Sequence, residues 1–95
     1  MAAYYIVIRE QLKDQAGLDI YSNKAYQAMT DKVEFVAGNG KFEAIEGAAP
    51  DGVVILRFPD MDEARKWYNS EAYQHALPFR QASAECRVLL VEGVK

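Results

Sequence analysis

One stretch of the chain, residues 58–80, carries most of the side chains that could do chemistry. It contains the only histidine, His75, together with Trp67, Tyr68 and Tyr73. The imidazole of His75 is the candidate general acid or base, because histidine is the side chain whose ordinary pKa lies near neutral pH. Trp67 and the two tyrosines could line an apolar pocket in which the phenolic hydroxyls bind a ligand.

Two arginines are candidate anchors for an anionic ligand, because a guanidinium can bind a carboxylate through two parallel hydrogen bonds. One of them, Arg80, could instead pair with a neighbouring acid, either Glu71 or Glu85. The other, Arg57, follows a continuous apolar run, so its side chain either reaches water at a strand end or lies in a cleft.

Each of these candidates also has a purely structural interpretation. A lone histidine on a helix is often a surface or capping residue, and Trp67 can simply pack a helix against a sheet. The sequence is compatible with both interpretations. A heme-binding oxygenase is a further alternative, and it depends on His75 facing the cleft between helices and sheet.

The sequence offers little for a metal or a nucleotide. There is one histidine and one cysteine, Cys86, so the usual nitrogen and sulfur ligands of a transition metal are missing. The glycines of residues 38–40 lead into a strand rather than into a phosphate-binding helix. We therefore predict no metal and no cofactor, and we expect Cys86 to act as a small buried apolar residue rather than a reactive thiol.

Composition places the chain among small globular domains. Its 95 residues predict one domain, residues 1–95, and the formal net charge of −3 comes from interspersed charges without the basic stripe of a nucleic-acid binder. No run approaches the roughly 18 apolar residues of a membrane span, and no signal-peptide pattern is present. The single cysteine fits a reducing compartment, so we predict a cytoplasmic protein.

Hydrophobic periodicity predicts the elements of the first half of the chain. Residues 4–10 are rich in aromatic and branched side chains and predict a strand with two largely apolar faces. Residues 18–30 show an apolar stripe at helical spacing, in which Leu18, Tyr21 and Ala25 recur. Two further strands are predicted at residues 33–37 and 41–46, the second because polar and apolar side chains alternate.

The second half has clearer boundary signals. Residues 53–58 form a continuous apolar run and predict a central strand. Asp60 is a helix N-cap candidate for a helix to about residue 69, and Ser70 is the N-cap candidate for the next one. Pro78 lacks an amide donor, so the second helix should end or kink just before it. Residues 86–92 predict the last strand.

Apart from the additional strand at residues 41–46 and the break in the second helix, the predicted order is β-α-β-β-α-β, the α+β ferredoxin-like arrangement of an antiparallel sheet with helices on one face. Such a sheet leaves its second face uncovered, and here that face would carry Tyr5, Val7 or their neighbours and half of residues 53–58. With 51% apolar residues, the chain is rich enough to bury this face against a second copy. We therefore predict a homodimer, in the form of a dimeric α/β barrel.

Residues 58–74, 80–82 and 88–93 resemble the small proteins grouped as domain of unknown function 1330. The core of the resemblance is the sequence Trp-Tyr-Asn-Ser-Glu-Ala-Tyr at residues 67–73. It implies a ferredoxin-like subunit that forms a dimeric α/β barrel, and it implies no particular reaction. The central strand of that family commonly ends in Glu-Phe-Pro, where this chain has Arg57 before Phe58 and Pro59.

These observations predict a protein that binds a small organic molecule, with an anionic one fitting the arginines, in the cleft between sheet and helices. If it is an enzyme, it would be a cofactor-independent isomerase, lyase or monooxygenase-like protein that uses acid/base chemistry. His75, Tyr68 and Tyr73 would then be catalytic, and a ligand-binding set would hold the substrate: Arg57, Arg80 and Trp67. The alternative is a non-catalytic ligand-binding or assembly module whose aromatic stretch forms core and dimer interface.

Overall fold

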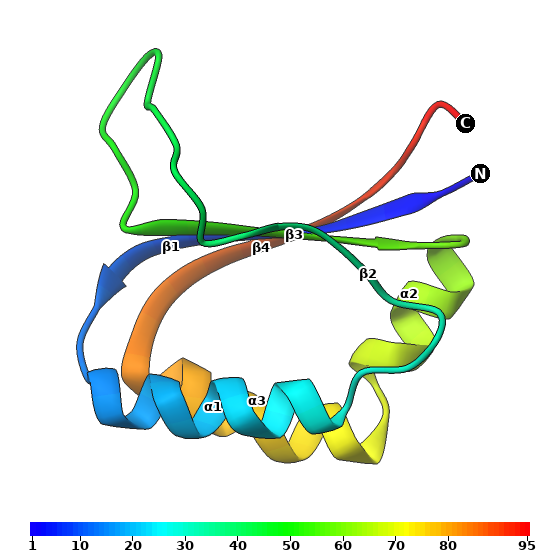
Figure 1. Ribbon diagram of the computed structural model, residues 1–95, viewed down its shortest axis with the longest axis horizontal. Helices are drawn as coiled ribbons and strands as arrows, with labels where there is room; N and C mark the ends of the chain where they lie inside the picture. Colours follow the sequence, from blue (N-terminus) through cyan, green and yellow to red (C-terminus); the bar gives the residue numbers. More distant parts are fainter.

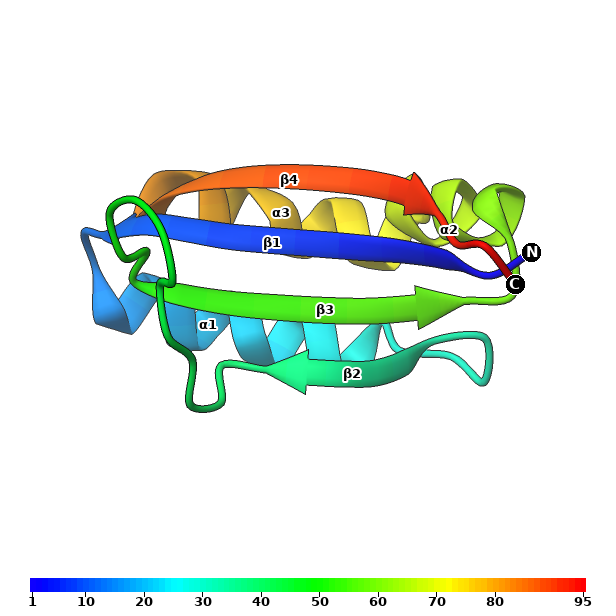
Figure 2. The ribbon, with the colours of Figure 1, turned by 90° about the horizontal axis from the view of Figure 1, so that it is seen from above.

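The computed structural model describes residues 1–95 and consists of an antiparallel sheet with three helices on one face (Figure 1). The elements are, in chain order, β1 (Ala3–Leu12), α1 (Gln15–Gln27), β2 (Glu34–Gly38), β3 (Gly52–Phe58), α2 (Met61–Tyr68), α3 (Glu71–Ser83) and β4 (Ala84–Glu92). The strand order is β2-β3-β1-β4, which is visible from above in Figure 2. This is the predicted α+β fold, a ferredoxin-like βαββαβ subunit.

The two helices of the second half begin where the capping signals predicted. The side chain of Asp60 accepts a hydrogen bond of 2.8 Å from the amide of Glu63, and α2 follows. The hydroxyl of Ser70 accepts one of 3.2 Å from the amide of Tyr73, and α3 follows. Each cap satisfies an amide that the first helical turn would leave without a partner.

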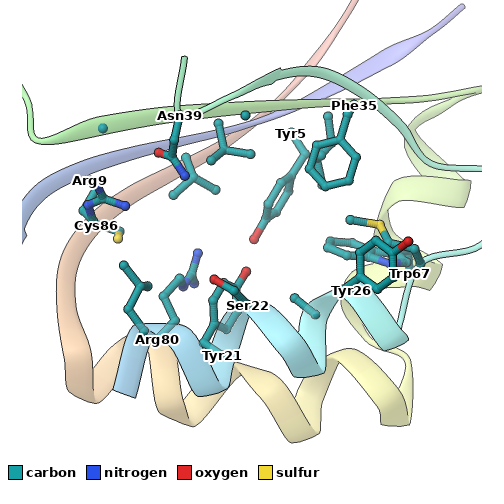
Figure 3. Close-up of a pocket in the computed structure, with 18 residues that line it drawn as sticks. Tyr5, Arg9, Tyr21, Ser22, Tyr26, Phe35, Asn39, Trp67, Arg80 and Cys86 are labelled. Carbon is teal, nitrogen blue, oxygen red and sulfur yellow. The ribbon is translucent and has the colours of Figure 1, made fainter. Parts of the chain in front are cut away.

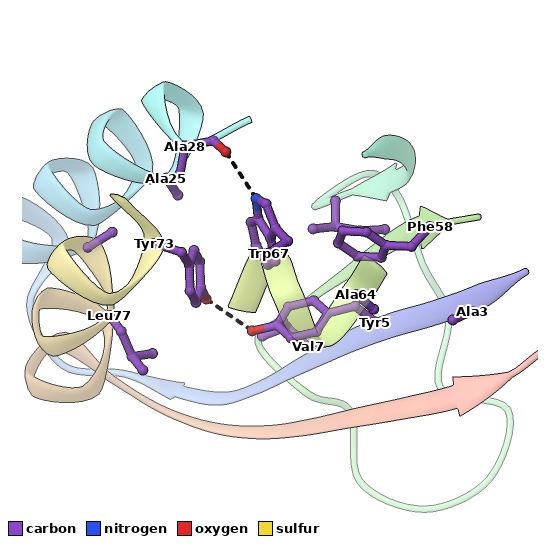
Figure 4. Packing of buried hydrophobic residues seen from close by; sticks show 12 residues of the cluster. Ala3, Tyr5, Val7, Ala25, Ala28, Phe58, Ala64, Trp67, Tyr73 and Leu77 are labelled. Atoms are coloured by element: carbon purple, nitrogen blue, oxygen red, sulfur yellow. Dashed lines mark hydrogen bonds between the residues drawn. The ribbon is translucent and has the colours of Figure 1, made fainter. Parts of the chain in front are cut away.

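The core lies between the sheet and the helices (Figure 4). Along β1 the odd-numbered residues Ala3, Tyr5 and Val7 face the helices and are buried, as expected from the two-residue period of a strand. They meet α2 and α3, whose Trp67 and Tyr73 are almost completely buried. The aromatic part of residues 58–80 is therefore mainly core.

The first helix packs on another helix more than on the sheet. α1 makes most of its contacts with α3, and the crossing is close because Gly17 has no side chain. A Cβ atom at Gly17 would collide with the hydroxyl oxygen of Ser83. Since α1 leans on α3 in this way, space remains between α1 and the half of the sheet formed by β2 and β3.

The opposite face of the sheet has no cover. Tyr4, Ile6 and Ile8 of β1 point to this side, because their neighbours Tyr5 and Val7 point to the helices. Antiparallel register places further apolar residues beside them, namely Val53, Ile55, Leu89 and Val91. We call these seven residues the bare face. The sequence predicted an uncovered apolar face here, and it is the neighbours of Tyr5 and Val7 that form it.

Two predictions about local structure were wrong. Residues 41–46 alternate like a strand but form no strand, and they lie in the connection between β2 and β3 that rises on the bare-face side (Figure 1). Their alternation lacks a neighbouring strand with which to share hydrogen bonds. Pro78 does not end its helix either, since α3 continues to Ser83. Buried residues on both sides of Pro78, Leu77 and Arg80, outweigh the loss of one backbone hydrogen bond.

None of the three helices combines the length and the apolar character required to span a lipid bilayer.

Candidate functional site

A cavity of roughly 300 Å³ lies between the sheet and α1, in the space left by the close contact of α1 with α3 (Figure 3). Twelve of the 18 residues that line it are hydrophobic. β1 and β3 contribute its ceiling, and Leu18, Tyr21 and Ala25 of α1 contribute its floor. Its size is at the lower end of the range for small-molecule sites.

Arg80 brings a positive charge to this cavity from α3. Its side chain is buried, with 6% of the residue exposed, and its Nη1 atom has no hydrogen-bond partner. Arg80 belongs to none of the five ion pairs of the chain, and Glu85, one of its expected partners, pairs with Lys13 instead. A buried guanidinium without a carboxylate is unusual, because burying an unpaired charge costs free energy.

Three tyrosine hydroxyls meet beside the cavity. The hydroxyl of Tyr73 lies 3.0 Å from that of Tyr5 and 2.9 Å from that of Tyr21. Tyr5 and Tyr21 line the cavity, whereas Tyr73 lies behind them in the core. The three residues come from β1, α1 and α3, so the fold assembles this cluster from distant parts of the chain.

Burial determines the protonation state of these phenols. It raises the pKa of Tyr5, Tyr21 and Tyr73 above the ordinary value, and the nearby charge of Arg80 only partly offsets this effect. The three side chains are therefore neutral at physiological pH and act as hydrogen-bond donors and acceptors. They cannot serve as bases in that state.

Trp67 forms one wall of the cavity and is held in place by its neighbours. Its ring packs 4.2 Å from that of Tyr73 and 5.5 Å from that of Tyr5, measured between ring centroids. Its indole nitrogen donates a hydrogen bond to the carbonyl of Ala28 (Figure 4). Trp67 thus has both of the roles considered from the sequence, a core residue that also faces the cavity.

The structure brings three of the six predicted site residues together: Arg80 and Trp67 line the cavity, and Tyr73 lies directly behind it. The other three do not line the cavity, although the ring of Tyr68 packs 5.4 Å from that of Tyr73, measured between centroids. His75 is exposed on α3, outside the cavity. Tyr68 faces a separate shallow hollow, although Arg80 also borders it. Arg57 points to the bare-face side and pairs with Glu34 at 3.7 Å.

Sequence reasoning missed several residues of this cavity. Tyr21 belongs to the apolar helical stripe of residues 18–30, and a hydroxyl in such a stripe indicates a polar partner across the core. Tyr5 gave no signal beyond strand propensity. Arg9 also lines the cavity, and its guanidinium lies 3.6 Å from the carboxylate of Asp51. Their convergence is a property of the fold, which no local pattern reveals.

Cys86 and the acidic residues add no reactive centre. Cys86 is a free, half-buried thiol at the edge of the cavity, and burial raises its pKa, which disfavours the reactive thiolate. No cluster of three or more histidine, cysteine or acidic side chains that could hold a metal ion occurs in the chain. No aspartate, glutamate or histidine lines the cavity.

The fold and the cavity define a class, that of small ferredoxin-like proteins with an apolar cavity between sheet and helices. Within it, residues 2–94 match the model of the family described as "Domain of unknown function (DUF1330)", so the chain belongs to that family. The family resemblance seen in residues 58–93 is therefore confirmed. A search of curated protein sequences gave no match.

Solved structures share the fold at low sequence identity. A protein of unknown function from Rhodopseudomonas palustris has a TM-score of 0.78 at 15% identity, over 99% of this chain and 83% of that one. A dimeric ferredoxin-like protein of unknown function from Thermobifida fusca has a TM-score of 0.66 at 13% identity, over 97% and 91%. SnoaB, described as a cofactor-independent oxygenase from Streptomyces nogalater, has a TM-score of 0.63 at 11% identity, over 99% and 93%.

Proposed function

We propose that this protein binds a small organic acid in the cavity between the sheet and α1. The observation that carries the proposal is Arg80, a buried guanidinium that faces the cavity and has no carboxylate partner in the chain. An anionic group of a ligand would supply the missing partner. A charge-assisted hydrogen bond of this kind is stronger than one between neutral groups.

The rest of the cavity sets the character of the ligand body. Most of its lining is apolar, and Trp67, Leu18 and Val54 offer flat and branched surfaces without hydrogen-bonding demands toward the cavity. A ligand would therefore carry its charge at one end and an alicyclic or aromatic body at the other. A volume of roughly 300 Å³ suits a compact molecule of one ring.

Binding is better supported than proton abstraction by the protein. The side chains at the cavity are cationic or neutral, and none of them is a base at physiological pH. His75, the residue expected to transfer protons, lies outside the cavity, and its catalytic role stays a prediction. SnoaB is described as an oxygenase that needs no cofactor, which bears on this chain only through the shared fold.

The binding unit is proposed to be a homodimer formed through the bare face. Exposure of the seven apolar side chains of the bare face to water is unfavourable. Leu89 and Val91, which belong to this face, are half-exposed in the single subunit. The Thermobifida fusca protein of the same fold is described as dimeric. A second copy would cover the bare face with an identical apolar surface, as a two-fold axis requires.

Trp67 provides the readout for a test of ligand binding, since it is the only tryptophan and faces the cavity. Cyclohexanecarboxylate is the probe, and the neutral cyclohexanecarboxamide is its matched control. Fluorescence titration should show saturable binding of the acid and much weaker binding of the amide. Arg80→Gln should lower the affinity for the acid about 10- to 100-fold, from the loss of a charge-assisted hydrogen bond.

Arg57→Gln is the control variant, because Arg57 is a surface arginine away from the cavity. It should bind the acid as the wild type does. Equal affinity of the wild type for acid and amide, or an Arg80→Gln variant that binds the acid unchanged, would contradict the proposal. Calorimetric titration with the same two compounds provides a readout that does not depend on fluorescence.

A further inference from the structure

The three tyrosine hydroxyls beside the cavity form a hydrogen-bonded row, which we call the relay, with Tyr73 at its centre. Its two ends are Tyr5 on β1 and Tyr21 on α1. Their hydroxyl oxygens lie 3.0 and 2.9 Å from that of Tyr73 and are not hydrogen-bonded to each other. Both ends also line the cavity, while Tyr73 does not. Both ends of the relay therefore face the same cavity.

The number of protons in this relay exceeds the number of its hydrogen bonds. Three neutral phenols carry three hydroxyl protons, and the two contacts between them use one proton each. One proton is left over. Its position decides where the cavity offers a hydrogen-bond donor.

The extra proton belongs at one end of the relay rather than at its centre. Tyr73 has no exposed surface, and its hydroxyl forms hydrogen bonds only with Tyr5 and Tyr21. If Tyr73 accepted both hydrogen bonds, its own proton would be buried without a partner, which is unfavourable. Tyr73 therefore donates to one neighbour and accepts from the other, and the free proton lies on Tyr5 or Tyr21.

The donor and the positive charge point into the same region. In Figure 3 the hydroxyl of Tyr5 and the guanidinium of Arg80 are directed into the cavity from opposite sides, the sheet and the helices. Arg80 also lies over the ring of Tyr21, with 5.7 Å between its Cζ atom and the ring centroid. A ligand bound to Arg80 in the cavity would therefore lie near one phenolic hydroxyl that can donate a hydrogen bond.

Resting on the proposed function of anion binding, we infer that the cavity selects oxo acids, organic acids that carry a ketone in addition to the carboxylate. The carboxylate binds Arg80, and the ketone oxygen accepts the free proton of the relay. A ketone oxygen can only accept, so it pairs with the end tyrosine that it lies against once that tyrosine carries the free proton. Reversal of the two hydrogen bonds at Tyr73 moves the donor between Tyr5 and Tyr21 without leaving a proton unpaired.

The test compares the affinities of cyclohexanecarboxylate, 3-oxocyclohexanecarboxylate and 4-oxocyclohexanecarboxylate by calorimetric titration. At least one oxo acid should bind the wild type about three- to tenfold more tightly than the parent acid, as one neutral hydrogen bond would give. In the double variant Tyr5→Phe/Tyr21→Phe this ratio should fall to about one. In Tyr73→Phe it should be at least as large as in the wild type, because both end hydroxyls are then free to donate.

The single variants keep the test decisive if the double variant does not fold. Each leaves one end of the relay, so the variant that removes the end used by the ligand should lose the preference, and the other should retain it. Equal affinities for parent and oxo acids in the wild type, or a preference for the same oxo acid that survives both single variants, would overturn this inference alone. Absence of any acid binding that depends on Arg80 would overturn the proposed function as well.

Discussion

The indole Nε1 of Trp67 donates a hydrogen bond of 3.1 Å to the carbonyl of Ala28, the C-cap residue of α1. This hydrogen bond joins α2 to the end of α1. The two residues that form it are 39 positions apart in the sequence. The same indole packs on Phe58 and Tyr73, so it ties strand and helices together at one end of the cavity.

Trp67→Phe should therefore destabilise the fold. Phenylalanine keeps much of the aromatic packing but leaves the carbonyl of Ala28 without its partner and a gap beside it. The free energy of unfolding should fall by about 2 kcal/mol, measured by urea denaturation with circular dichroism as the signal. Tyr26→Phe, at a side chain that is largely exposed, should change it by less than about 0.5 kcal/mol. A Trp67→Phe variant as stable as this control would contradict the structural role of the bond.

The tyrosine relay predicts how stability depends on alkaline pH. Burial raises the native pKa of Tyr5, Tyr21 and Tyr73 above the value of about 10 in an unfolded chain. Above pH 10 the unfolded state therefore binds fewer protons than the native state, and stability falls as the pH rises. Each such phenol contributes up to about 1.4 kcal/mol per pH unit to this slope.

Denaturation curves between pH 9 and pH 11 provide the measurement. The free energy of unfolding should decrease most steeply above pH 10, and the slope of Tyr73→Phe should be shallower by about 1 kcal/mol per pH unit. Tyr26→Phe serves again as the exposed control. Equal slopes in the wild type and in Tyr73→Phe would show that the central phenol titrates alike in both states, contrary to its burial.

Local signals predicted the parts of the fold that depend on nearby residues. The caps at Asp60 and Ser70 act within four residues of the chain, so the sequence alone placed the starts of α2 and α3 correctly. The prediction of a strand at residues 41–46 was wrong because a strand also needs a neighbouring strand to pair with. An alternating sequence does not reveal whether such a neighbour is near. The prediction that the helix ends before Pro78 was wrong for the opposite reason. Tertiary packing of α3 outweighs the local preference of proline against a helix interior.

The site was less predictable than the fold. Arg80 and Trp67 stood out by residue type, and the structure brings them to one cavity. His75 stood out for the same reason and lies outside it, because its position on α3 faces away from the core. Tyr5 and Tyr21 lacked any such signal, since their importance comes from meeting Tyr73 across 68 and 52 residues of sequence.

The bare face predicts an oligomeric state that one charge should disrupt. Leu89 is half-exposed on β4 and points to the bare face beside Ile6, so Leu89→Asp should be tolerated in a single subunit but not between two apolar sheets. Sedimentation at micromolar concentration should show a dimer for the wild type and a monomer for Leu89→Asp. Ile20→Asp, at a half-exposed position of α1, should leave the dimer intact. A monomeric wild type, or an unchanged dimer in Leu89→Asp, would argue against this interface.

Replacing Arg80 by an apolar residue separates a binding role from a structural one. Arg80 is buried, yet it forms no ion pair, and its Nη1 has no hydrogen-bond partner. Its guanidinium lies over the ring of Tyr21, and a desolvated cation–π contact of this kind is worth about 2 kcal/mol. Burial of the unpaired charge costs more than this contact returns, because the guanidinium loses its hydration.

Arg80→Met should therefore raise the free energy of unfolding, by about 1–3 kcal/mol, while it abolishes the binding of cyclohexanecarboxylate. A gain in stability together with a loss of binding is the pattern expected of a residue retained for function at a cost to the fold. Urea denaturation and calorimetric titration on the same preparation measure the two effects. If Arg80→Met were instead destabilised by several kcal/mol, the guanidinium would have a structural role, and the buried charge would no longer support an anion-binding cavity.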